Sequence, residues 1–373
     1  MTSLFVFGTL RDRALLSIVA GRDLPARPAT LADHGVFLVE GEDFPICIPS
    51  PGIQSEGLLL SDLTDSEMAR FDFYELGFGY TRAQYDISVA DTTVPAQIYL
   101  PEEDALTPSS TPWSLPNWQA SYGELTREVA RVAMQLMGRV TPAELAVRWP
   151  VLEARAQTRL SARSRPSPAR AGVPDLAALE SLETTVPYDA FFRLEEHLLR
   201  FPQFAGGLSA PVKRAALVAV DAVTVLPYDP QLDRVLLVDQ FRIGAYARGD
   251  LQPWVLEPIA GRVDGGQSWE ETAHREAWEE AGVRLRSLEF IGGYYPSPGV
   301  LTEYIASYVG LCDLPDAQAG IYGVAEEGED IRAMLCSRDE LLMMTRNGRI
   351  QNGPLFLSAL WLEAHRDRLR GQV

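Results

Sequence analysis

The stretch GRVDGGQSWEETAHREAWEEAGV, residues 261–283, decides the fold of the C-terminal half of this chain. Ser268 and Glu271 stand at the S-x-x-E spacing of a capping box, which predicts that a helix begins at Trp269. Gly282 suits the left-handed backbone position that follows the last residue of many helices. The two signals together predict a single helix between them.

Three acidic residues of this helix share one face. Glu276, Glu279 and Glu280 are spaced i, i+3 and i+4, which places them about 5–6 Å apart. Like charges at this spacing repel, and nothing nearby in the sequence compensates them except Arg275, since residues 251–300 contain no lysine. Hard oxygen ligands so arranged suit Mg²⁺ or Mn²⁺. Spacing alone leaves a metal site and a solvated acidic face as equal alternatives.

The order of the residues resembles the Nudix box, G-x5-E-x7-R-E-U-x-E-E-x-G-U, in which U is apolar. Its positions are matched by Gly261, Arg275, Glu276, Ala277, Glu279, Glu280, Gly282 and Val283. The departure is Gln267, which stands where the box has Glu. We expect this loss of charge to tune metal number or affinity before it abolishes chemistry, so Gln267→Glu should tighten activation by Mg²⁺.

The surroundings resemble the ADP-ribose pyrophosphatase branch of that family, from about residue 185 to the C-terminus. WVLEPIAGRVDGG resembles the branch's lead-in to the box, YYPSPGVLTE its Ser-Pro-Gly segment, and GVAEEGEDIRA its acidic loop. The chain is also similar to tellurite-resistance proteins of the family. The resemblance implies hydrolysis of ADP-ribose to AMP and ribose 5-phosphate.

The resemblance also implies a set of metal ligands and a base. The groups that would hold Mg²⁺ or Mn²⁺ are the backbone carbonyl of Ala260 and the side chains of Glu276, Glu279, Glu280 and Glu329. Glu327 would orient and deprotonate the attacking water. Arg275 would pair with a box glutamate and fix its rotamer.

A second implied set contacts the substrate. Its members are Arg242, Glu303, Arg214, Ser297, Gly299 and either Phe191 or Phe192. Arg242 would contact the diphosphate, Glu303 the terminal ribose, and Phe192 or its neighbour the adenine. A place in the core is the alternative for both phenylalanines. The Glu expected two residues after Arg214 is Ala216, which leaves base recognition open.

The N-terminal part resembles the gamma-glutamylcyclotransferase-like fold. LFVFGTLR, residues 4–11, matches the opening in which backbone N–H groups of Gly8, Thr9 and Leu10 form an anion-binding turn. RFDFYELGFGYTR, residues 70–82, matches the segment whose Glu is the catalytic acid and base, here Glu75, although Leu76 replaces the usual Gly. The alternative is that Glu75 merely ends a surface helix.

The resemblances divide the chain into three parts and predict an α/β (α+β) protein. Residues 1–105 would be a small β-barrel-like domain, 106–180 a Pro-rich and helical linker, and 181–373 a Nudix α/β/α sandwich with a mixed sheet. The basic segment at 155–170 is expected to be a solvated linker, with an anionic docking tail as the alternative.

Composition excludes several partners. The formal net charge of −18 argues against binding nucleic acid in bulk, because phosphate backbones select basic surfaces. The scattered Cys47, Cys312 and Cys336 suggest neither a disulfide framework nor a zinc site. No apolar run approaches the ~20 residues of a membrane span, and the N-terminus has too short an apolar run for a signal peptide, so we expect a cytoplasmic protein.

Three functional hypotheses remain open at this point. The first is a Mg²⁺-dependent Nudix pyrophosphatase for ADP-ribose behind a cyclotransferase-like module, and the resemblance implies a homodimer. The second is a pyrophosphatase for another nucleoside diphosphate sugar. The third is a gamma-glutamyl cyclotransferase, or a ligand-sensing protein, with a weakened Nudix domain.

Overall fold

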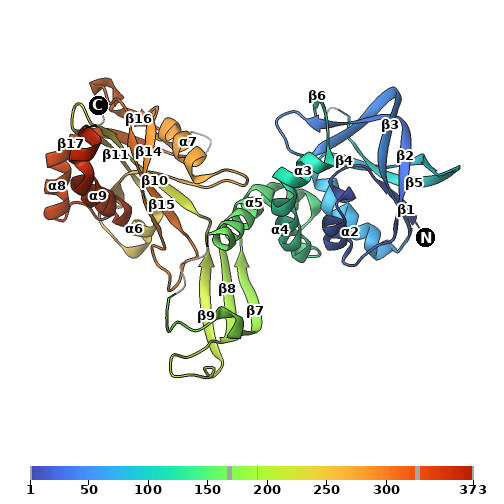
Figure 1. Ribbon diagram of the computed structural model, residues 1–373, viewed down its shortest axis with the longest axis horizontal. Coiled ribbons are helices and arrows are strands. Elements are labelled where there is room, and N and C mark those ends of the chain that lie inside the picture. Colours follow the sequence, from blue (N-terminus) through green and yellow to red (C-terminus); the bar gives the residue numbers. More distant parts are fainter. Residues whose placement is uncertain (1, 104, 166–169, 191, 324–327, 372–373) are drawn as a thin grey trace. The chain divides into compact units, whose positions relative to one another are not determined.

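The computed structural model describes residues 2–103, 105–165, 170–190, 192–323 and 328–371 (Figure 1). The chain divides into two compact units, Met1–Ser161 and Ala162–Val373. Among the described helices, none is both long enough and apolar enough to span a membrane. The domain limits at residues 105 and 180 stay predictions, because a division by contacts does not mark where a family domain ends.

A closed five-stranded barrel forms the base of the first unit. Its strands follow the order β3-β1-β5-β4-β2, and β2 pairs with β3 to close the ring. The pairing of β1 with β5 is parallel and the others are antiparallel. The strands are β1 (Thr2–Val6), β2 (Ala26–Val39), β3 (Pro45–Leu63), β4 (Tyr80–Val89) and β5 (Thr92–Pro101). The predicted barrel-like domain is confirmed.

The Pro-rich segment after residue 101 adds a strand to the barrel. β6 (Pro108–Pro112) pairs with β2, with Pro112 opposite Phe37. A proline cannot donate a backbone hydrogen bond, so it is tolerated on an edge strand such as this one.

Helices pack on the barrel and form an apolar core with its strands. Leu4 and Val6 of the barrel share this core with Leu15, Phe71 and Val129 of the helices. The helices are α1 (Arg13–Ala20), α2 (Asp65–Glu75), α3 (Leu115–Ser121), α4 (Gly123–Ala133) and α5 (Pro142–Ser164), with 3₁₀ turns η1 (Thr9–Arg11), η2 (Leu76–Phe78) and η3 (Met134–Leu136).

The segment at 155–164 is helical; up to Leu160 it packs on a core and is not solvated as predicted, whereas residues 162–164 are exposed. α5 runs without a break through Pro150 to Ser164. Leu152, Ala156 and Leu160 lie at i, i+4 and i+8, and they pack on the core of the first unit. The basic residues between them conceal this stripe in the sequence.

The second unit begins with a three-stranded sheet and continues into a mixed sheet. The small sheet has the order β7-β8-β9, and the large one β14-β15-β10-β11-β17-β16, with β12 on β11 and β13 on β10. β10 and β15 are parallel. The strands are β7 (Glu180–Asp189), β8 (Arg193–Arg200), β9 (Val212–Val218), β10 (Ala222–Asp229), β11 (Arg234–Phe241), β12 (Trp254–Glu257), β13 (Ile259–Arg262), β14 (Ser287–Tyr294), β15 (Ile305–Leu311), β16 (Gly320–Tyr322) and β17 (Ile331–Ser337).

Helices lie on both faces of the mixed sheet, which confirms the predicted sandwich (Figure 1). Along β10, Val223 and Val225 face one core, and Leu226 and Tyr228 face the other. The first core contains α7 (Trp269–Ala281), and the second contains α8 (Arg338–Arg346) and α9 (Gly353–Arg370). A short helix, α6 (Ile243–Arg248), follows β11.

Candidate active site

The helix α7 has the ends that the sequence predicts. The Ser268 hydroxyl accepts a hydrogen bond from the Glu271 N–H at 3.1 Å, and Glu271 reaches back to the Ser268 N–H at 2.8 Å. Gly282 has φ 60° and stops the helix. These local signals fix which residues of α7 face the sheet.

Small residues bring α7 close to β13. Ala273, Ala277 and Ala281 are fully buried against the sheet. At Gly261 an added Cβ would lie 1.8 Å from the Glu276 carboxyl carbon, so only glycine leaves room for that carboxylate. Glu280 is 2% exposed, and its Oε2 accepts from the Ala260 N–H at 3.1 Å. The close approach therefore holds two box carboxylates against the end of β13.

These two carboxyl groups are hard to ionise where they stand. Burial, opposed by the Arg275 guanidinium and reinforced by the Glu279 and Glu329 carboxylates, raises the pKa of Glu276 to about 7. Burial likewise raises the pKa of Glu280 to about 8, and Glu276 and Glu329 contribute to the shift. A divalent cation would favour the ionised form of both groups, so the chemistry of this donor set fits Mg²⁺ or Mn²⁺.

The predicted metal ligands that the structure describes lie near one another, but their side chains do not converge on one point. Among the residues that the structure describes, no three acidic, histidine or cysteine side chains converge as a metal site. Glu329 is within electrostatic range of Glu276 and Glu280. Glu279 is more exposed and its Oε2 accepts from Arg275 at 2.9 Å. The predicted base Glu327 lies outside the described residues.

Arg242 points toward the same group of carboxylates. Burial opposes its charge, but Glu257, Glu280 and Glu329 together raise the pKa of Arg242. Its Nη2 lies 2.6 Å from Glu257 Oε2, and its Nε donates to the same oxygen at 2.8 Å. The two-point contact fixes the guanidinium beside the box.

Glu257 is a site residue that the sequence analysis missed. It is 6% exposed at the end of β12, and its other oxygen accepts from the Asn352 side-chain amide at 2.9 Å. An acidic residue that ends the apolar run Trp254–Leu256 was the available signal. We infer that Glu257 positions Arg242.

Glu303 is close to Arg242 and to Arg262, the second residue of the box. Burial raises its pKa, and the charges of Arg242 and Arg262 oppose the rise. Ser297 and Gly299 are exposed in the turn before it, where the Val300 N–H bonds to the Ser297 carbonyl at 3.1 Å. This turn is tied to β9, since the Leu217 N–H donates to the Val300 carbonyl at 2.8 Å.

Two residues predicted to contact the substrate, Phe192 and Arg214, lie apart along their strands. In the β8–β9 register Arg193, which follows Phe192, lies opposite Val218, whereas Arg214 lies opposite His197. Four residues along a strand span on the order of 13 Å. Phe192 is 42% exposed and so is not a core residue, while Phe191 lies outside the described part of the chain. The stacking of Phe192 on the adenine and the contact of Arg214 with the substrate both stay predictions.

Glu75 occupies an apolar environment in the first unit. It ends α2, and burial alone raises its pKa to about 7. Burial, helped by the Glu75 charge, also raises the pKa of Tyr80, whose hydroxyl donates to the Pro45 carbonyl at 2.7 Å. At Gly8 an added Cβ would lie 2.6 Å from Pro45 Cγ. Pro45 thus links the Gly8 turn to the tyrosine beside Glu75.

The other two residues of that turn differ in exposure. Leu10 is 3% exposed with its side chain in the core, so only its backbone is available to a ligand. Thr9 is half-buried and starts η1. The turn leads into Asp12, which caps α1 through the Leu15 N–H at 2.8 Å.

α5 supplies a second carboxyl group that the sequence analysis missed. Glu153 accepts from the Trp149 indole N–H at 2.8 Å, and burial raises the pKa of Glu153 to about 7. The Trp149 ring packs edge-on against Tyr74 and Phe78, which flank Glu75 in sequence. No sequence signal links these segments, because tertiary packing alone brings them together.

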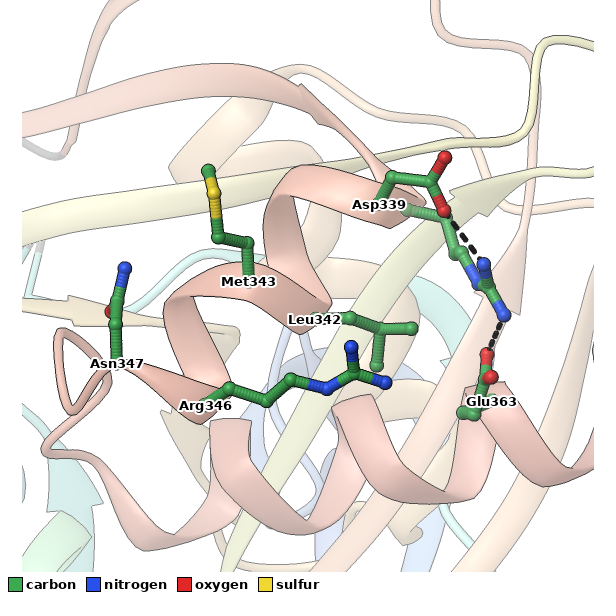
Figure 2. Close-up of a pocket in the computed structure, with 7 residues that line it drawn as sticks. Asp339, Leu342, Met343, Arg346, Asn347 and Glu363 are labelled. Atoms are coloured by element: carbon green, nitrogen blue, oxygen red, sulfur yellow. Dashed lines mark hydrogen bonds and ion pairs between the residues drawn. The ribbon is translucent and has the colours of Figure 1, made fainter.

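Figure 2 shows a surface hollow between α8 and α9 that contains none of the predicted residues. It is lined by Arg338, Asp339, Leu342, Met343, Arg346, Asn347 and Glu363. Arg338 is paired with Asp339 and Glu363 on either side. Its charge is already neutralised, and we assign no role to the hollow.

Two families match different parts of the chain. Residues 218–356 match the NUDIX domain family, and residues 4–119 match the family of Gamma-glutamyl cyclotransferase, AIG2-like proteins. The second match includes the Gly8 turn, Glu75 and the start of the helices that cover the barrel.

Similar proteins cover the second half of the chain. The ADP-ribose pyrophosphatase of Escherichia coli (strain K12) is 36% identical over 185 residues, which are 50% of this chain and 88% of that protein. The ADP-ribose pyrophosphatase of Haemophilus influenzae is 37% identical over 194 residues, 52% and 89% respectively. The GDP-mannose pyrophosphatase of Pectobacterium atrosepticum is 31% identical over 177 residues, 47% and 89%.

Proposed function

This chain belongs to the Nudix hydrolase family, with a gamma-glutamyl cyclotransferase-like domain at its N-terminus, and we propose that it hydrolyses ADP-ribose to AMP and ribose 5-phosphate. It is a hydrolase that acts on a diphosphate anhydride. The single observation that carries the proposal is the buried pair Glu276 and Glu280, held at the end of β13 by the space that Gly261 leaves.

The proposed metal ligands are Glu276, Glu280 and the Ala260 carbonyl, with Glu279 and Glu329 as further ligands. When bound, Mg²⁺ or Mn²⁺ would neutralise the diphosphate oxygens and acidify the attacking water. The burial of Glu276 and Glu280 supports this assignment, because two buried carboxylates of like charge need a counter-charge to ionise together at neutral pH.

The chain's own residues then bind and orient the substrate. Arg242, held by Glu257 at two points, would donate to the diphosphate and keep it in line with the water. Glu303 would accept from hydroxyl groups of the terminal ribose. Glu327 remains the proposed base, which would take the proton from the water as the P–O bond breaks.

Substrate identity is tested by a panel of nucleoside diphosphate compounds with identification of the products. We expect Mg²⁺-dependent release of AMP from ADP-ribose at a higher kcat/KM than release of GMP from GDP-mannose. If ADP-ribose stays intact while another nucleotide sugar is cleaved, the substrate assignment is wrong, although the family stands.

The N-terminal domain carries a second candidate activity. Glu75 is a carboxyl group whose pKa of about 7 suits a proton carrier at neutral pH, which favours a cyclotransferase over a passive domain. We propose that Glu75 transfers a proton as the alpha-amino nitrogen of a gamma-glutamyl amine attacks the gamma-carbonyl carbon, the bond to the gamma-bound amine breaks, and 5-oxoproline and the free amine leave. A panel of gamma-glutamyl compounds tests this, and Glu75→Gln should abolish any release; no release by the wild type would favour a ligand-sensing role.

The remaining expectations stay predictions. They are a homodimer, a cytoplasmic location, a boundary near residue 105, a second near 180, and a link to tellurite resistance.

A further inference from the structure

Arg275, a residue of the box, contacts five oxygen atoms through three hydrogen bonds and two further ion pairs. Its Nε donates to the Gln267 side-chain oxygen at 3.3 Å. Its Nη1 lies 2.8 Å from Glu276 Oε1 and 2.9 Å from Glu279 Oε2. Its Nη2 donates to the Arg262 carbonyl at 3.1 Å and lies 3.2 Å from Asp264 Oδ2. Contacts at Nε, Nη1 and Nη2 together fix the orientation of this planar guanidinium.

The loop before α7 provides two of these contacts from one turn. The Gln267 N–H donates to the Asp264 carbonyl at 3.2 Å, so the two side chains leave the turn near each other. Gln267 is also held by the Thr272 hydroxyl, which donates to the same oxygen at 3.1 Å. Gln267 thus keeps the acceptor that the box requires but brings no charge.

We propose that Asp264 supplies the negative charge that Gln267 lacks, and that it is a positioning residue for the metal ligand Glu276. Asp264 holds one edge of the Arg275 guanidinium, and the opposite nitrogen holds Glu276. Gly261 leaves the Glu276 carboxylate little freedom on its other side. A loose Arg275 would therefore release Glu276 from its only charged partner among the contacts described above.

The proposal rests on the proposed metal site and makes a specific claim about coupling. If Asp264 and position 267 serve the same guanidinium, a carboxylate at position 267 can replace the one lost from position 264. Loss of the Asp264 charge should weaken metal binding in the natural Gln267 background and have little effect when Glu occupies position 267. Two independent surface residues would instead give additive effects.

The test is direct Mn²⁺ binding without substrate, measured by electron paramagnetic resonance of the free ion. Only the Mn²⁺ binding that is lost in Glu276→Gln is assigned to the proposed site. This control is needed because a chain of net charge −18 is expected to bind cations elsewhere as well. The proteins compared are the wild type, Asp264→Asn, Gln267→Glu, the double variant, Asp264→Glu and the control Asp313→Asn. Asp313 is a similarly exposed acid paired with an arginine, Arg286, outside the box.

We expect Asp264→Asn to raise the Kd for Mn²⁺ about threefold, as for a partly exposed ion pair behind a ligand. The double variant and Asp264→Glu should both return to within about twofold of the wild type, and Asp313→Asn should not change the Kd. Wild-type affinity in Asp264→Asn, or a double variant as weak as Asp264→Asn, overturns the proposal and leaves the Nudix assignment intact. Absence of a Glu276-dependent Mn²⁺ site in the wild type overturns the proposed metal site itself.

Discussion

Glu276 in the second unit and Glu75 in the first have a pKa raised to the same value, but their neighbours differ. Burial raises both to about 7. Glu276 also has Arg275 at 2.8 Å and two further carboxylates in range, whereas burial is the whole cause at Glu75. Charged side chains therefore surround Glu276, whereas buried tyrosines lie around Glu75.

The difference teaches what each site is suited to do. A group of carboxylates with raised pKa values binds a cation, because the cation offsets burial and repulsion together. A carboxyl group whose pKa is raised by burial alone exchanges a proton near neutral pH. The same pKa therefore supports a metal ligand in one unit and an acid–base group in the other.

The largest expected effect is the loss of a buried charge from the metal site. Glu280→Gln keeps the shape and an acceptor for the Ala260 N–H, but removes the negative charge. We expect kcat/KM for hydrolysis to fall by at least about 100-fold. The matched control is Glu270→Gln on the first turn of the same helix, which should stay within about twofold; equal losses in both variants would mean that the face of α7 is irrelevant.

A second test removes the space for Glu276. Gly261→Ala would place a methyl group 1.8 Å from the Glu276 carboxyl carbon and displace it. We expect activity to fall about 10- to 100-fold, since a ligand misplaced by about 1 Å costs that much, and stability to fall by about 1–3 kcal/mol. Gly292→Ala in β14 is the control, because an added Cβ there has no neighbour within 4 Å. Hydrolysis rates and urea unfolding of both variants provide the comparison.

The burial of Glu75 is tested by the pH dependence of the free energy of unfolding. Its pKa is about 7 in the folded protein against an ordinary value of 4.5, so between these pH values the folded state binds the extra proton. Stability from this group is complete below about pH 4.5 and is lost as pH rises through 7. Relative to Glu75→Gln, the wild type should lose about 1–3 kcal/mol of unfolding free energy between pH 4.5 and 8. Parallel curves for the two proteins would show that Glu75 is solvated.

The smallest effect concerns the helix caps. Ser268→Ala and Ser337→Ala each remove the same capping box, at the start of α7 and α8 respectively. Both should lose about 1 kcal/mol of stability. Only Ser268→Ala should also weaken Mg²⁺ activation, by about twofold, because α7 carries the ligands. Thermal unfolding and Mg²⁺ titration measure the two effects. Identical Mg²⁺ curves for the two variants would show that losing the cap of α7 does not affect the metal site.

The local parts of this fold could be predicted because their signals are local. Ser268, Glu271 and Gly282 define α7 through contacts within a few residues, and the box spacing follows from the helix. The positions of Glu257 and Asp264 could not be predicted in the same way. Which arginine each carboxylate pairs with depends on how strands and loops pack.

Contacts between segments far apart in the sequence also could not be predicted. Glu153 lies on a helix far along the chain, and only packing of Trp149 on Tyr74 and Phe78 brings that helix to the segment around Glu75. The resemblance implies that Phe192 and Arg214 both contact the substrate, but the strand register that sets them apart does not follow from the sequence. The basic side chains at 155–170 predict a solvated linker because they hide the stripe of Leu152, Ala156 and Leu160, which packs on the core.

The most direct test of the account is AMP release from ADP-ribose, measured with Mg²⁺ for the wild type, Glu276→Gln and Glu75→Gln side by side. We expect equal release by the wild type and Glu75→Gln, and no metal-dependent release by Glu276→Gln. Full activity in Glu276→Gln, or its loss in Glu75→Gln, would contradict the assignment of phosphate chemistry to the box alone.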